Sequence, residues 1–332
     1  MFKGSSASQD LTQVVRALKS ASEPTRLRLL VLLSHGEFTV GELCAVLGQS
    51  QPRISRHLRL LTEAGFLDRF REQQCVYYRA PVTGRYLEWS RVLLSMLEPD
   101  GVVLRRDRDR AAQVVRARAA VAARQLGPDA TSNEEDPRED LARLLVEELG
   151  PSSVDELLDV GTGSGLMLEV LGPRAGHAVG IDISAPALRV ARTRIHGVGL
   201  THCEFRRGDM YSLPVEDGAF DLVTLDRVLT LAQHPAAALL EAARALRQGG
   251  RLLVVEDFEQ LEPRSETNPL TQLRAWLHSA ALTSLRLRPC DVAGRHLIIA
   301  LARHGSQPSA SLATTLQSSD PILVPHHSTA HL

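Results

Sequence analysis

The segment ELLDVGTGSG, residues 156–165, constrains the fold of this chain more than any other stretch. An apolar strand ends in Asp159, and a glycine-rich loop then opens a helix at Leu166. The loop glycines are Gly161, Gly163 and Gly165. Glycines let the backbone approach a ligand, and free amides at a helix start favour polar or anionic groups. A dinucleotide fingerprint needs a third glycine where Leu166 stands, so the loop does not match it.

The residues after this loop repeat a strand-then-helix pattern, which is typical of a doubly wound parallel sheet. The run HAVGIDIS ends a second strand at Asp182, and Asp209 follows a third. FDLVTLD, with Asp221 near its start, forms a fourth strand, and RLLVVEDF a fifth. The last two segments, SLRLRPC and RHLIIALAR, are predicted to close the sheet as a hairpin around 291–294.

The first part of the chain is helical. Residues 11–34 predict two helices, and 39–48 and 50–65 predict two shorter ones joined by a turn at Gly48. Ser50 is a suitable N-cap and Gly65 a suitable C-terminal stop. Three side chains of the last helix are expected to be buried, namely Ile54, Leu58 and Leu61. The pattern therefore predicts a helix-turn-helix.

The strand-forming run after Gly65 predicts a two-stranded wing that turns around 72–74. From Ser50 to Arg79 there are six arginines and three acidic residues, an excess of three positive charges in a chain of net charge −1. A capped helix with a basic face beside a basic hairpin is typical of DNA binding. The predicted DNA contacts are Ser50, Gln51, Arg53, Ser55, Arg56, His57, Arg59 and Arg71.

Residues 21–80 resemble the ArsR/SmtB family of winged-helix repressors along their whole length. The resemblance implies a homodimer, with the first helix and the helix at about 84–97 in the interface, that reads a double-stranded DNA operator. Arsenic-sensing members carry two cysteines in an ELCxCxL motif. Here Cys44 is present but Val46 replaces the second cysteine, so no metal site is expected and Cys44 reads as a small buried residue.

Residues 141–304 resemble class I S-adenosylmethionine-dependent methyltransferases. The resemblance implies a Rossmann-like sheet of seven strands with the last antiparallel, and S-adenosyl-L-methionine as cofactor. It assigns Asp159 and the loop glycines to the methionine end and Asp182 to the ribose. It assigns Asp209 and Met210 to the adenine. Ile183 and Asp226 complete the expected cofactor-binding set.

The expected domains are a winged helix over 8–98, a helical linker over 99–140, a methyltransferase over 141–304 and a disordered tail over 305–332. Within the linker, 127–140 reads as an exposed connection. The four cysteines are far apart, and there is no signal peptide and no membrane-spanning run, so we expect a cytoplasmic protein without disulfides.

Catalytic residues are not identifiable from the sequence. His234 precedes Pro235 and is expected to face solvent rather than act as a base. Asp226 and Arg227 lie where a methyl acceptor would approach. Methyl transfer needs little acid–base help, so positioning alone can support it.

The leading hypothesis is a dimeric DNA-binding regulator whose methyltransferase domain either methylates a small molecule or senses S-adenosylmethionine. Three alternatives stay open: a small-molecule methyltransferase with an accessory winged helix, a repressor with a vestigial methyltransferase domain, and a nucleotide-dependent oxidoreductase. The missing third glycine weighs against the last of these.

Overall fold

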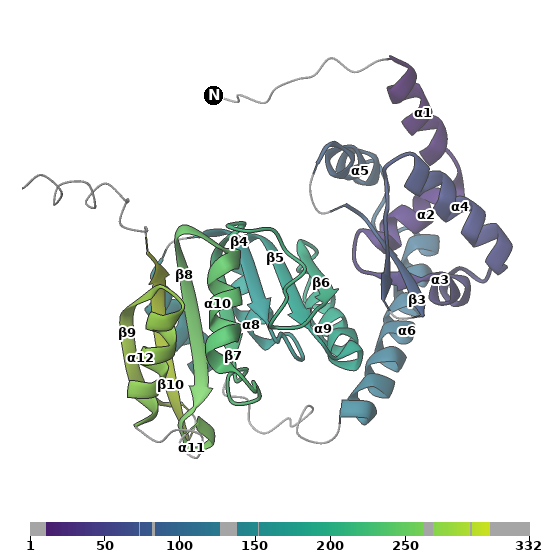
Figure 1. The fold of residues 1–332 in the computed structure, drawn as a ribbon. Coiled ribbons are helices and arrows are strands. Elements are labelled where there is room, and N and C mark those ends of the chain that lie inside the picture. Colours follow the sequence, from purple (N-terminus) through teal and green to yellow (C-terminus); the bar gives the residue numbers. More distant parts are fainter. Residues whose placement is uncertain are drawn as a thin grey trace, which may run out of the picture.

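A computed structural model describes residues 11–72, 74–81, 84–126, 138–151, 153–261, 268–292 and 294–305. The chain forms a helical part with a small sheet, a long connecting helix, and an α/β part built on one large sheet (Figure 1). Among the described helices, none is both long and apolar enough to cross a membrane.

The first part is a winged helix, as predicted. Its elements are α1 Leu11–Ala21, α2 Pro24–Leu33, β1 Phe38–Thr39, α3 Val40–Leu47, α4 Gln51–Glu63, β2 Asp68–Glu72, β3 Cys75–Arg79 and α5 Arg85–Ser95. The three strands pair antiparallel in the order β1-β3-β2, so β2 and β3 form the expected wing.

Local sequence sets the boundaries of the helix-turn-helix. A capping box between Thr39 and Glu42 starts α3, and Gly48 ends it with a φ of 65°. Ser50 is at the N-cap position of α4, but its hydroxyl makes no capping hydrogen bond, so that part of the expectation is wrong. Ile54, Leu58 and Leu61 are fully buried, as predicted.

The helix α6, Val102–Leu126, is more than a linker, because it packs against α2 and α3 of the winged helix and against α9 of the α/β part. A further helix, α7 Arg138–Leu149, takes in residues 138–140, which the sequence had suggested as part of an exposed connection. The rest of that connection, 127–137, and the tail from 306 lie outside the described residues.

The α/β part begins with β4 Val154–Val160 and continues through α8 Leu166–Leu171, the 3-10 turn η2 Gly172–Arg174, β5 Ala175–Asp182, α9 Ala185–Gly197, β6 Cys203–Arg207, β7 Phe220–Asp226 and α10 Pro235–Ala245. It ends with β8 Leu246–Asp257, α11 Phe258–Leu261, α12 Pro269–Ser279, β9 Leu282–Val292 and β10 Arg295–His304.

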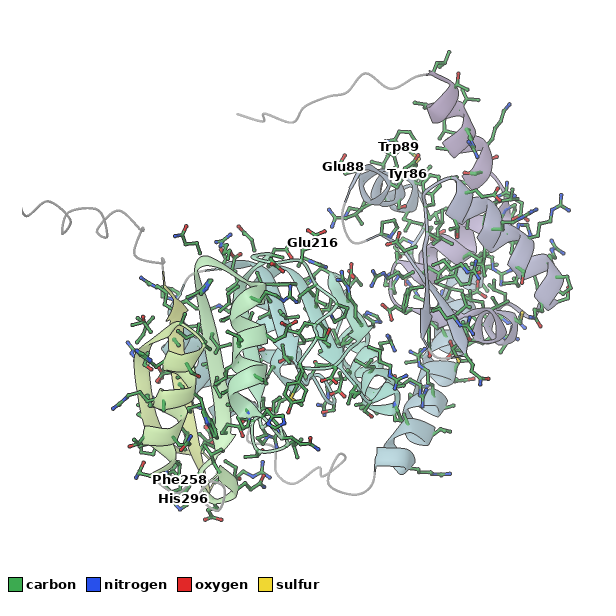
Figure 2. The ribbon with its side chains drawn as sticks, in the orientation of Figure 1. Tyr86, Glu88, Trp89, Glu216, Phe258 and His296 are labelled. Atoms are coloured by element: carbon green, nitrogen blue, oxygen red, sulfur yellow. The ribbon has the colours of Figure 1, made fainter. Side chains whose placement is uncertain are left out.

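These strands form one sheet in the order β6-β5-β4-β7-β8-β10-β9, and β10 runs antiparallel to both of its neighbours. The predicted seven-stranded sheet with an antiparallel last strand is therefore confirmed. One apolar core lies under α10 and α12 and another under α7, α8 and α9, so helices cover both faces of the sheet. Figure 2 marks its two ends, with Glu216 at one end and Phe258 and His296 at the end where β8 stops.

Candidate cofactor cavity and DNA-binding surface

A cavity of about 850 Å³ lies at the end of the sheet where the parallel strands stop. Its walls come from the loop after β4, the ends of β5 and β7, the segment after β6, α11 and the start of β10. Ligands of open α/β sheets bind at this edge, and the volume is in the usual range for small-molecule sites.

Gly161 forms part of the cavity wall at a φ of 67°. A Cβ on Gly161 would lie 2.5 Å from Val228 Cγ2, so only glycine fits between the loop and the segment after β7. Gly163 also lines the cavity. Gly165 does not, and a Cβ there would lie 3.2 Å from Ala191 Cβ, so its role is close packing of α8 against α9.

Asp182 links the glycine loop to α9. Its carboxylate accepts hydrogen bonds from the Gly163 amide at 2.9 Å and the Ser184 amide at 2.7 Å. The side chain is half-buried at the cavity wall, beside Ile183, and Asp209 and Met210 line the wall after β6. Both Asp182 oxygens are thus held in place, and the residue borders the cavity where the ribose is expected.

Asp159 does not line the cavity, contrary to the expectation that it contacts the cofactor. The residue is 1% exposed, and the Thr224 hydroxyl donates a hydrogen bond to its carboxylate at 2.7 Å. Burial raises the pKa of Asp159 to about 7. The side chain therefore ties β4 to β7 beneath the loop.

Asp226 lines the cavity, as expected, together with Arg227. The Arg227 guanidinium donates to both carboxylate oxygens of Asp226, at 3.1 and 3.0 Å. The backbone of Arg227 has a φ of 54°, a strained value for a residue with a side chain. Behind this turn, Glu256 accepts from the Leu229 amide, and burial raises its pKa to about 7.

Gln260 and Arg295 complete the far wall of the cavity, and sequence reasoning did not find them. Arg295 has no ion pair among the residues that the structure describes. The predicted strand order could have identified these residues, because the turn between β9 and β10 lies at the same edge of the sheet as the glycine loop. His234 is exposed at the N-cap of α10 and does not line the cavity, as expected.

The predicted DNA-contacting residues of α4 divide into exposed and enclosed ones. Ser50, Gln51, Arg53, Arg56 and Arg59 are exposed, Ser55 is half-buried, and Arg71 is exposed on β2. The side chain of His57 is only 12% exposed and its Nδ1 lies 3.7 Å from the Glu23 carboxylate. Because burial lowers the pKa of His57, this residue reads as a structural contact rather than a phosphate ligand.

Arg79 was expected to add to the positive charge of the wing, but it is engaged inside the molecule. It forms ion pairs with Glu37 at 3.2 Å and with Glu204 of β6 at 2.7 Å. Arg192 of α9 also pairs with Glu37, and both of these side chains are 1% exposed. We call Glu37, Arg79, Arg192 and Glu204 the docking cluster.

The docking cluster joins the wing to the edge of the large sheet. The Arg192 guanidinium carbon lies 5.0 Å from the Tyr77 ring centre, 5.8 Å from that of Phe70 and 5.8 Å from that of Phe205. It also donates to the Phe205 carbonyl at 3.2 Å. Burial alone would raise the pKa of Glu204, but its hydrogen bond with His177 and its contacts with Arg79 and Arg206 together lower this pKa to about 2.

All four cysteines are free. Cys44 is half-buried against the core of the winged helix, and burial raises the pKa of its thiol. Within the described part of the chain, no group of three His, Cys, Asp or Glu side chains is arranged to hold a metal ion.

Two family models match the chain. Residues 23–69 match the model described as "Bacterial regulatory protein, arsR family", and 158–254 match the model described as "Methyltransferase domain". Each covers less than half of the chain.

Individual relatives match the α/β part. The ubiquinone/menaquinone biosynthesis C-methyltransferase UbiE of Ruegeria sp. is 35% identical over 120 residues, which are 35% of this chain and 48% of that protein. An arsenite methyltransferase of Halobacterium salinarum is 28% identical over 155 residues, 41% of this chain and 39% of that protein. The chain thus spans half or less of these curated relatives.

Among solved structures, a SAM-dependent methyltransferase from Aquifex aeolicus is similar, with 19% identity and a TM-score of 0.42 over 51% of this chain and 98% of that one. The two family models and the strand order of the large sheet agree with the two domains expected from the sequence. The chain joins an ArsR-type helix-turn-helix domain to a class I methyltransferase domain, whose cofactor is S-adenosyl-L-methionine.

Proposed function

We propose that this protein is a dimeric DNA-binding regulator whose methyltransferase domain holds S-adenosyl-L-methionine and reports its presence to the DNA-binding part. The observation that carries the proposal is the position of Asp182. Its carboxylate is bonded to the glycine loop on one side and to the start of α9 on the other. Ser184 is the N-cap of this helix. Arg192, eight positions later, belongs to the docking cluster.

The cavity suits the cofactor on three counts. At Gly161 a Cβ would collide with Val228, so glycine lets the loop take its place in the cavity wall. Asp182 is expected to accept from the ribose hydroxyls, and Asp209 with Met210 to border the adenine. The bound cofactor supplies a methyl group on a sulfonium, which leaves as a neutral thioether.

The route between the two parts runs through one helix. A ligand that orders the Asp182 end of α9 changes the free energy of every contact that α9 makes, including those of Arg192 with Glu37 and the wing. A regulatory effect requires that the cofactor bind the DNA-competent and DNA-free states unequally. The docking cluster is a contact that can differ between these states, because it holds the wing itself.

The proposed dimer rests on exposed apolar side chains of α1 and of α5 with its C-cap residue Met96, and both helices are at the upper side of the winged helix in Figure 1. Leu11 is 76% exposed, Leu18 51%, Val92 56% and Met96 74%. Large apolar side chains left exposed on two helices of one domain are candidates for an interaction surface, and a second copy of the chain is the proposed occupant. A Leu18→Glu, Met96→Glu variant should then be monomeric in sedimentation velocity.

The experiment that tests the proposal is fluorescence anisotropy on the DNA upstream of the gene, with and without saturating S-adenosylmethionine or S-adenosylhomocysteine. A tenfold change in affinity corresponds to about 1.4 kcal/mol of coupling. The change should vanish in Asp182→Ala, which loses the ligand, and in Arg192→Met, which keeps the ligand and loses the route. Equal DNA affinity in all conditions would refute coupling.

A second candidate function is methylation of a small acceptor, and the size of the cavity favours it. Beyond the glycine loop the cavity extends to Thr230, Gln260 and Arg295, which is room that the acceptor would use. Positioning of the acceptor by these side chains would be the domain's contribution to methyl transfer. Single-turnover transfer to a defined acceptor that ignores operator DNA would favour this function over sensing.

A further inference from the structure

A second cavity, of about 330 Å³, lies where the two domains meet and belongs to neither the cofactor site nor the DNA-binding surface. Three elements form it: the end of α2 with the turn into β1, one face of α6, and the second half of α9. Its volume is in the range of sites that hold a small organic ligand.

The floor of this junction cavity is apolar. Leu32 is 3% exposed, Phe38 4% and Ala111 7%, and Val31 and Val115 add further aliphatic surface. Gly36 lies close to α9, because a Cβ at this position would be 3.3 Å from His196 Nδ1. The two domains therefore approach closely enough to enclose apolar space, and a bound apolar group would be removed from water.

The walls are positively charged. Arg108 and Arg116 are eight positions apart on α6, with Ala112 between them, so all three lie on one helix face. Arg108 is 37% exposed, and its one ion pair with a described residue is with the exposed Asp100, at 3.2 Å, a weak kind of pair. Arg116 is exposed and has no ion pair among the described residues.

Arg118 adds a buried donor to the same wall. Its side chain is 9% exposed, and its Nη1 bonds to Glu42 and to the Glu37 carbonyl. Its Nε is buried without an acceptor in the part of the chain that is described. Among the described residues, Glu37 is the one carboxylate that lines the cavity, and it is already engaged by Arg79 and Arg192.

We propose that the junction cavity is a binding site for an amphipathic organic anion, whose apolar part lies on the Leu32–Phe38–Ala111 floor and whose carboxylate or sulfonate meets the α6 arginines. This ligand would contact both domains at once, so its binding would stabilise the docked arrangement. The site is separate from the Asp182 cavity and does not depend on methyl transfer or on cofactor sensing.

The test uses the full chain and two defined probes. Binding of 1-anilinonaphthalene-8-sulfonate is followed by fluorescence and calorimetry, and sodium decanoate is then used as competitor, with decanol as its uncharged counterpart. We expect one site per chain, displaced by decanoate at least tenfold more effectively than by decanol. Saturating S-adenosylmethionine should leave the probe in place.

Two variants locate the site. Arg116→Gln, an exposed position with little effect on folding, should weaken probe binding about tenfold, because a charge-assisted contact is lost. Ala112→Trp should fill the cavity and abolish binding. Arg124→Gln removes an exposed arginine from the last turn of the same helix and should have no effect.

Three results would overturn the proposal: full probe affinity in both Arg116→Gln and Ala112→Trp, equal competition by decanol and decanoate, or displacement of the probe by S-adenosylmethionine. The cofactor is titrated into the same variants by calorimetry. Retained cofactor binding with lost probe binding supports the junction site. If the wild-type chain does not bind the cofactor at all, the function proposed above is refuted, and the test of the junction cavity still stands.

Discussion

The docking cluster gives a measurable prediction about how the two domains unfold. The perturbation is Arg192→Met, which keeps the length of the side chain and removes its charge. Removing one partner of a buried ion pair typically costs about 3–5 kcal/mol, since the other charge is left buried. Glu37 retains Arg79 at 3.2 Å, so we expect the lower end, about 3 kcal/mol.

The two tryptophans of the chain allow each domain to be observed separately. Trp89 lies in α5 of the winged helix and Trp276 in α12 of the methyltransferase domain. In Trp89→Phe and Trp276→Phe backgrounds, urea unfolding followed by fluorescence reports one domain at a time. The midpoints should coincide while the docking cluster is intact and separate once Arg192→Met is introduced.

A double-mutant cycle isolates the pair itself. Combining Glu37→Gln with Arg192→Met should cost less than the sum of the single changes by about 2 kcal/mol. Arg274→Met, which removes an exposed arginine of α12, is the matched control and should change stability by no more than about 0.5 kcal/mol. A coupling energy near zero, with coincident midpoints in every variant, would refute the view that this cluster holds the domains together.

Three further predictions concern binding and pH. Asp182→Asn should weaken S-adenosylmethionine binding at least tenfold in calorimetry, since the amide nitrogen cannot accept from the ribose; unchanged affinity would remove Asp182 from the site. Arg56→Gln should weaken DNA binding and reduce the slope of log affinity against log salt by about one, measured by anisotropy, whereas an unaltered slope would mean that Arg56 meets no phosphate. The pKa of buried Asp159 is about 7 in the folded chain and about 4 in an unfolded one, so the folded state holds an extra proton between these values. Its contribution is full below pH 4 and is lost as the pH rises to 7, so the free energy of unfolding falls across this interval. Asp159→Asn should flatten that fall in urea unfolding at pH 5 and 8, and parallel pH profiles would contradict the assignment.

Much of the architecture was predictable, because it rests on local patterns. Alternating strand and helix segments, with β4 to β8 each ending in or directly before an aspartate or a glycine, define a doubly wound sheet and place its ligand edge. The helix-turn-helix followed from Gly48 and the burial spacing of Ile54, Leu58 and Leu61, and the structure agrees. These features need only information from neighbouring residues.

The contacts between the domains were not predictable. Glu37 and Arg192 are 155 positions apart, and in the sequence Arg192 looks like any charged residue on a helix. Arg79 was expected to add to the positive charge of the wing because its neighbours alternate as in a strand, yet its side chain pairs with Glu204 of the large sheet. Likewise, the motif around Asp159 indicates an important carboxylate without indicating whether it touches the ligand or supports the strand beneath it.

The length of α6 has a consequence for how this chain can vary. At about 100° of rotation per residue, a single insertion near its middle would turn the residues after the insertion, including Arg118, away from their partners while leaving those before it in place. Changes of about 7 or about 11 residues, close to two or three full turns, nearly restore the angular phase. The two domains are therefore joined in a fixed rotational register, and graft experiments that exchange either domain must carry α6 with its phase intact.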